Sequence, residues 1–134
     1  MERFLDYGRY FITIVGTGFT WLFGAWDTAI MVLICFMVCD YITGILKGWY
    51  KKELSSDTGL KGIARKFLIL LVLMVAVALD RLLNTGTWVF RTLACYFYIA
   101  NEGLSILENS VSLGLKVPEQ LKNALIQLQD KKSE

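Results

Sequence analysis

The stretch MVLICFMVCDYITGILKG, residues 31–48, begins as a continuous apolar run and then places a carboxylate, Asp40, in its middle. Apolar segments of this length are typical of helices that cross a membrane. An ionisable side chain is costly within lipid and commonly marks a functional site there. The fold and the function of this chain therefore both depend on what Asp40 faces.

The rest of the chain has the same apolar character. Hydrophobic residues make up 55% of the 134 residues, more than a soluble domain of this size could bury. They gather in blocks of about 17 to 20 residues, which is roughly the length that crosses a bilayer as a helix. The blocks cover residues 4–23, 28–46, 67–83 and 88–107. The sequence therefore predicts an all-α integral membrane protein with three to four transmembrane helices.

The predicted organisation is a single membrane domain over residues 1–134. Its parts are an amphipathic or first transmembrane helix at 1–27, transmembrane helices at 28–46, 67–83 and 88–107, a basic connector at 47–66 and a tail at 108–134.

The charges in the connectors predict the orientation in the membrane. Connector 47–66 is rich in lysine and arginine, and short basic loops stay in the cytoplasm. Connector 84–87 is uncharged and belongs outside. The tail, which carries Lys116, Lys122, Lys131 and Lys132, is then cytoplasmic. If the first block spans, the N-terminus is cytoplasmic as well.

The first block carries a polar stripe at helical spacing. Its members are Asp6, Arg9, Thr13, Thr17 and Thr20. Two structures fit this pattern: a helix that lies in the membrane interface, and a spanning helix whose stripe faces other helices or water. The threonines and glycines favour close helix contact, and hence the spanning form.

The tail contains a further amphipathic pattern. Pro118 suits the start of a helix, and Leu121, Ala124, Leu125 and Leu128 follow at helical spacing. The sequence predicts a short helix of about three turns. It either lies solvated on the membrane surface, which is the favoured interpretation, or serves as a docking or regulatory segment.

Charged residues inside the blocks can be placed by depth. At a rise of about 1.5 Å per residue, Asp40 and Glu102 lie at similar levels in the inner half of the membrane. Asp80 and Arg91 lie near the outer ends of their helices and can pair. Asp27 offers Arg91 a second possible partner.

These residues belong to polar seams on otherwise apolar helices. The small residues Gly44 and Gly48 would allow two helices to approach closely. The seams either pair within one subunit or meet other subunits or water, and the second interpretation is favoured because four thin helices enclose polar groups poorly. The candidate oligomer or pore residues are Asp40, Thr43, Gly44, Lys47, Gly48, Asp80, Arg91, Asn101, Glu102, Ser105 and Asn109.

Several function classes find no support in the sequence. No phosphate-binding loop, metal-ligand cluster or nucleophile with a base is evident, so we expect neither enzyme activity nor a cofactor or metal, and no nucleic-acid partner. The cysteines Cys35, Cys39 and Cys95 lie within apolar blocks and are interpreted as packing residues.

Four short motifs together resemble a known family. Residues 40–44 (DYITG), 55–66 (SSDTGLKGIARK), 101–109 (NEGLSILEN) and 113–118 (LGLKVP) are similar to the phage holin family of the toxin-secretion and phage-lysis type. The resemblance covers about residues 36–129. It touches Asp40, Thr43, Gly44, Gly59, Gly62, Lys66, Asn101, Glu102, Asn109 and Pro118.

This resemblance implies a non-enzymatic protein of the bacterial cytoplasmic membrane that uses no cofactor. It would assemble with itself and open the bilayer at a set time, so that an endolysin or a toxin reaches the outside. Two other hypotheses stay open: an antiholin that joins such an assembly without opening it, and a small ion-coupled transporter. Transporters usually show internal repeats, and none is evident here.

Overall fold

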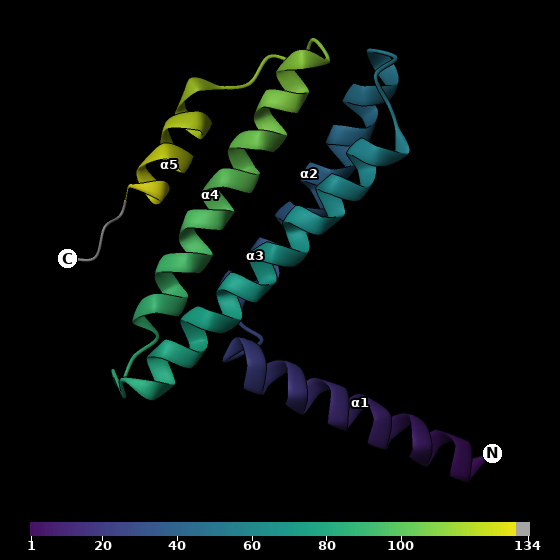
Figure 1. Cartoon of the computed structure of the whole chain (residues 1–134), viewed down its shortest axis with the longest axis vertical. Helices are drawn as coiled ribbons and strands as arrows, with labels where there is room; N and C mark the ends of the chain where they lie inside the picture. Colours follow the sequence, from purple (N-terminus) through teal and green to yellow (C-terminus); the bar gives the residue numbers. More distant parts are fainter. Residues whose placement is uncertain (131–134) are drawn as a thin grey trace.

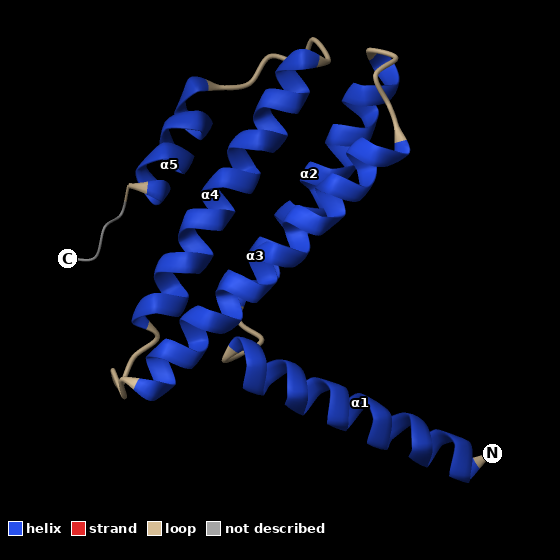
Figure 2. Ribbon diagram, viewed as in Figure 1, coloured by secondary structure: helices blue, strands red, loops and turns tan. Residues whose placement is uncertain are grey.

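The computed structural model describes residues 1–130, and within that range every regular element is a helix (Figure 2). The helices are α1 (Glu2–Phe23), α2 (Thr28–Tyr50), α3 (Ser56–Leu82), α4 (Val89–Ser112) and α5 (Glu119–Gln129). Lys131 and Lys132 of the predicted basic tail lie outside the described residues. The all-α prediction is confirmed for the described chain.

Helices α2, α3 and α4 run side by side as a bundle, and α5 folds back along α4 (Figure 1). Helix α1 leaves the end of the bundle and points away, across its long direction rather than along it (Figure 1). The core lies between α2, α3 and α4, with a contribution from the last turn of α1. Its fully buried members include Ile30, Leu33, Leu73 and Cys95.

Local capping explains where several helices begin. Asp27 accepts a hydrogen bond from the Ile30 amide at 3.1 Å and so caps the start of α2. Ser55 and Thr58 form a reciprocal capping box that starts α3. Pro118 directly precedes α5, as the sequence predicts.

The predicted connector 47–66 is largely helical. Its first residues complete α2, and the capping box begins α3 at Ser56, so the two helices are joined by residues 51–55 alone. The basic residues beyond this turn therefore lie on α3, at fixed positions relative to α2 and α4.

Within residues 1–130, α2 and α3 are long and apolar enough to cross a membrane. The sequence prediction of three to four spans is thus supported for two helices. Helices α1 and α4 fall short of the same hydropathy, since α1 contains Asp6 and Arg9, and α4 contains Arg91 and Glu102.

Candidate functional site

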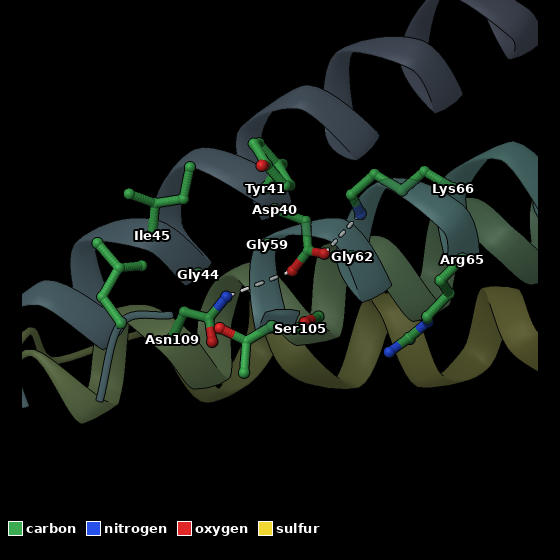
Figure 3. Close-up of a pocket in the computed structure, with 12 residues that line it drawn as sticks. Asp40, Tyr41, Gly44, Ile45, Gly59, Gly62, Arg65, Lys66, Ser105 and Asn109 are labelled. Atoms are coloured by element: carbon green, nitrogen blue, oxygen red, sulfur yellow. Dashed lines mark hydrogen bonds and ion pairs between the residues drawn. The ribbon is translucent and has the colours of Figure 1, made fainter. Parts of the chain in front are cut away.

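A buried ionic cluster joins the three bundle helices. The Lys66 ammonium on α3 donates a hydrogen bond to Asp40 Oδ2 on α2 at 2.7 Å, and another to Glu102 Oε2 on α4. The Glu102 side chain is fully buried, and those of Asp40 and Lys66 are each 14% exposed. One ammonium therefore serves two carboxylates, one from each neighbouring helix. Figure 3 shows the Asp40–Lys66 pair.

The second oxygen of Asp40 is also occupied. Asn109 Nδ2 on α4 donates to Asp40 Oδ1 at 3.3 Å and to Thr43 Oγ1 at 3.1 Å. The Thr43 hydroxyl in turn donates to the Asp40 carbonyl at 3.0 Å. Both oxygens of the carboxylate that interrupts residues 31–48 therefore bind side chains of neighbouring helices (Figure 3).

The cluster holds more negative than positive charge when all its members are ionised. Glu102 Oε1 is buried and has no hydrogen-bond partner within the described chain. An uncompensated charge is strongly disfavoured in an apolar interior. Lys66 binds both carboxylates, and Arg65 beside the adjacent cavity supplies a second cation near them.

A cavity of about 230 Å³ lies beside the cluster, between α2, α3 and α4. Two glycines of α3 make room for the aromatic ring that borders it, since a Cβ at Gly62 would lie 3.4 Å from the Tyr41 ring and one at Gly59 would lie 3.6 Å from its hydroxyl. The polar and charged side chains around the cavity belong to Asp40, Tyr41, Thr58, Arg65, Lys66, Ser105 and Asn109. A polar space of this size can hold water.

A second ionic cluster lies at the opposite end of the bundle. The buried Arg91 side chain of α4 binds both carboxylate oxygens of Asp27, at 2.8 and 2.9 Å. It also donates to the carbonyls of Phe23 and Ala25. Arg91 thus fixes the α1–α2 connector to α4. Its hydrogen bonds lower the pKa of Asp27, against the opposing effect of burial.

The structure decides between the two partners proposed for Arg91. Its guanidinium pairs with Asp27, while the buried Asp80 carboxylate accepts the backbone amides of Phe90 and Arg91, at 3.0 and 2.8 Å. Asp80 also accepts the Thr85 hydroxyl at 3.3 Å. Carboxylates are favourable at helix N-termini, so Asp80 serves as a cap of α4.

The other α2 residues of the predicted seam lie around the cavity end of the bundle. A Cβ at Gly44 would lie 3.9 Å from the Asn109 amide, so this glycine faces α4. Gly48 instead packs against Leu54 of the short connector, at 3.3 Å from its hypothetical Cβ. Lys47 is half-buried near the end of α2.

The polar residues of α4 divide between two neighbours. Asn109 joins the Asp40 cluster, whereas Asn101 accepts a hydrogen bond from Gln129 of α5 at 2.6 Å. A Cβ at Gly103 would lie 2.9 Å from the Leu125 side chain, so the glycine leaves space for α5. Helix α5 is thus packed against α4 of its own chain.

The polar stripe of α1 meets few partners. Thr13 and Thr20 donate to carbonyls of their own helix, each at 2.9 Å. Asp6 and Arg9 form an exposed pair at 3.9 Å. Thr17 is exposed as well. The stripe does not join either ionic cluster.

Sequence reasoning missed the role of Lys66 as the bridge between Asp40 and Glu102. In the sequence, its charge reads only as part of the orientation signal of the basic connector. Its position could have indicated the bridging role, because Lys66 is the last basic residue before the apolar run of α3.

Comparisons with known proteins agree with the motif resemblance. The model of the bacteriophage holin family matches residues 17–130. An uncharacterised 14.9 kDa protein of Clostridium perfringens is 57% identical over 132 residues, which is 98% of this chain and 100% of that protein. An uncharacterised protein of Listeria monocytogenes is 46% identical, over 94% of this chain and 87% of that protein.

One relative carries a functional name. The probable holin of Bacillus phage phi105 is 41% identical over 95 residues, which is 70% of this chain and 69% of that protein. No solved structure matches the chain. The family match covers α2 to α5 and the end of α1, and so includes every residue of both ionic clusters. The chain belongs to the bacteriophage holin family, which is not a family of enzymes.

Proposed function

We propose that the chain is a holin, which assembles with copies of itself in the bacterial cytoplasmic membrane and opens lesions that release an endolysin or a toxin. Family membership and the phi105 relative support this proposal. The observation that carries it in this chain is the buried cluster of Asp40, Lys66 and Glu102 in an apolar bundle. The proposed partners are other copies, the bilayer and, in some settings, an antiholin; no nucleic acid takes part.

In this proposal α2, α3 and α4 all cross the membrane. Helix α4 is less apolar than the other two, but Arg91 and Glu102 are buried against neighbouring helices, and Leu93 and Phe97 lie on its surface. The basic turn 51–55 and the tail then lie in the cytoplasm, in line with the positive-inside rule. The turn between α3 and α4 lies outside.

The two ionic clusters mark the borders of the proposed membrane-embedded part. Asp27, Asp80 and Arg91 form the outer layer, and the Lys66 cluster forms the inner one. On α3 the layers are separated by residues 67–79, about 20 Å at 1.5 Å per residue. A typical hydrocarbon core is about 30 Å thick, so in this proposal the two layers lie closer together than the borders of an undisturbed bilayer.

The proposed mechanism starts from subunits whose charges are satisfied internally. Each subunit can then diffuse singly in the membrane, with its ionic groups turned towards its own helices. As subunits accumulate, contacts between them compete with these internal contacts, and mass action supplies a density threshold. Above the threshold, polar faces of α2 and α4 turn towards water in a shared opening.

Expression of the chain alone in a bacterium tests the proposal. We expect growth arrest and loss of membrane potential at a defined time, and lysis when a cytoplasmic endolysin without its own export signal is also present. No effect alone, combined with delay of another holin, would support the antiholin alternative instead. Purified protein in liposomes should release large dyes above a threshold density; movement of small ions alone would favour the transporter alternative.

A further inference from the structure

Helix α1 presents a long amphipathic surface that the rest of the chain does not cover. Phe23 is its buried residue, at the very end of the helix. A Cβ at Gly8, Gly16 or Gly18 would meet nothing within 4 Å. The helix points away from the bundle, across its axis (Figure 1). It therefore does not follow α2, α3 and α4 along the direction in which they cross the membrane.

The two faces of α1 differ in chemistry. The polar stripe occupies one face, and Thr13, Thr17 and Thr20 line a shallow groove together with Arg81 of α3. The opposite face carries Phe11 and Val15, which are 69% and 53% exposed. A helix with one polar and one strongly apolar face, and without the hydropathy of a span, is typical of the membrane interface.

The C-terminal end of α1, next to the bundle, lies among side chains that prefer the membrane–water interface. The Arg81 guanidinium lies 5.2 Å from the Trp21 ring centre and 5.8 Å from that of Trp88. Tryptophans gather at membrane interfaces, where one part of the ring is apolar and another wet. Arg91 and Asp27 hold the α1–α2 connector at the same end of the bundle. The apolar face of α1 is thus continuous with the proposed lipid-facing surface at its outer border.

We propose that α1 is a surface helix of the outer leaflet: its Phe11–Val15 face lies on the acyl chains, its threonine stripe faces water beside Arg81, and the N-terminus is outside. The proposal rests on the placement of α2–α4 in the membrane given above. It replaces the spanning form of α1, and the cytoplasmic N-terminus, that the sequence favoured. The proposed partner of this surface is lipid rather than a second copy of the chain.

Cysteine labelling of the full-length protein tests this assignment. In a background with Cys35→Ala, Cys39→Ala and Cys95→Ala, single cysteines replace Thr13 on the stripe or Phe11 on the opposite face. Cells with an exposed cytoplasmic membrane are treated, before any loss of membrane potential, with a membrane-impermeant maleimide. Thr87→Cys in the proposed outer turn and Lys51→Cys in the proposed inner turn are the placement controls.

We expect Thr13→Cys to react severalfold faster than Phe11→Cys, and at a rate close to that of Thr87→Cys. Reaction of Thr13→Cys only after permeabilisation would overturn the proposal, as would equal reaction of both α1 cysteines or protection of both in detergent-free membranes. If Thr87→Cys is protected and Lys51→Cys reacts, the placement of the bundle itself is wrong. Labelling does not depend on lysis, so a failure of the holin proposal is detected separately.

Discussion

Lys66 and Glu102 form an ion pair between α3 and α4 at a point where the glutamate side chain is completely buried. The same ammonium binds Asp40 of α2 at 2.7 Å. One lysine thus connects three helices by binding two carboxylates. This arrangement makes the lysine more important for the stability of the bundle than any exposed basic residue of α3.

Replacement of Lys66 by methionine should strongly destabilise the protein. The change leaves two carboxylates without their cation, and loss of one partner of a buried pair typically costs about 3–5 kcal/mol. Thermal unfolding in detergent measures the effect. Lys61→Met is the matched control, because Lys61 pairs with Asp57 at the surface, where both side chains are over 75% exposed and such pairs contribute about 0–1 kcal/mol. Equal effects of both substitutions would contradict the assigned role.

Partial recovery should follow when the carboxylates of the cluster are neutralised together with the lysine. The triple variant Lys66→Met, Asp40→Asn, Glu102→Gln removes all three charges and keeps the side-chain volumes similar. Its unfolding temperature should lie above that of Lys66→Met alone, since no unpaired charge is then buried. A triple variant less stable than the single one would show that the unpaired carboxylates are not the cause of the destabilisation.

Asp40→Leu or Glu102→Leu should alter the time of lysis without abolishing membrane insertion. Each substitution removes a polar group that the proposed opening turns towards water. Each also leaves Lys66 with one carboxylate partner instead of two. Lysis curves after induction, with membrane fractionation to confirm insertion, measure the two properties separately. If both variants lyse at the unchanged time, the carboxylates do not control triggering.

Substitution of Arg91 by lysine should weaken the attachment of the α1–α2 connector. Lysine cannot reproduce the two-point contact with Asp27 or the bonds to the Phe23 and Ala25 carbonyls. We expect destabilisation by about 2–4 kcal/mol, because several charge-assisted hydrogen bonds are lost together. Arg9→Lys is the control, because Arg9 is exposed and pairs only loosely with Asp6, at 3.9 Å, so the change should alter the unfolding temperature little.

The Asp27–Arg91 pair also predicts a pH dependence. Hydrogen bonds from Arg91 lower the folded-state pKa of Asp27 below its ordinary value of 3.8. The pair therefore stabilises the protein fully above the unfolded-state pKa, and this contribution is lost as the pH falls through the lower folded-state pKa. Asp27→Asn should flatten this part of the unfolding profile between about pH 5 and about pH 3. An unchanged slope would show that other carboxylates account for it.

Gly103→Val should release α5 from α4. A Cβ at this position would lie 2.9 Å from the Leu125 side chain and 3.1 Å from the Phe36 ring, so a valine would push against the contact that holds α5 on α4. Trypsin cleavage at Lys122 reports the release and should become faster in the variant. Gly18→Ala is the control, because nothing lies within 4 Å of its Cβ. Unchanged cleavage in Gly103→Val would show that α5 moves together with α4.

Hydropathy and spacing predicted much of this molecule because they follow from local chemistry. The apolar blocks are helical, Pro118 directly precedes α5, and the common depth of Asp40 and Glu102 agrees with their shared bonds to Lys66. Apolar spacing does not reveal the capping box at Ser55, which starts α3 ahead of its apolar run and so places Lys66 within the helix.

Other features could not be read from the chain because they depend on tertiary contacts. Spacing alone does not distinguish a partner of Arg91 from a cap of α4, and Asp80 proved to be the cap. A glycine such as Gly103 carries no pattern that names Leu125 as its neighbour. The direction of α1 depends on the Arg91 contacts to its connector, which lie far away in sequence.

The short distance between the two ionic layers has a mechanical consequence. If the two layers are the borders of the membrane-embedded part, as proposed, lipid chains of ordinary length must compress or tilt to match a segment of about 20 Å, and this deformation costs free energy for every ångström of mismatch. Two subunits that share one locally thinned patch of bilayer deform less lipid than two separate subunits. The membrane itself would then draw subunits together over distances at which their side chains do not yet touch.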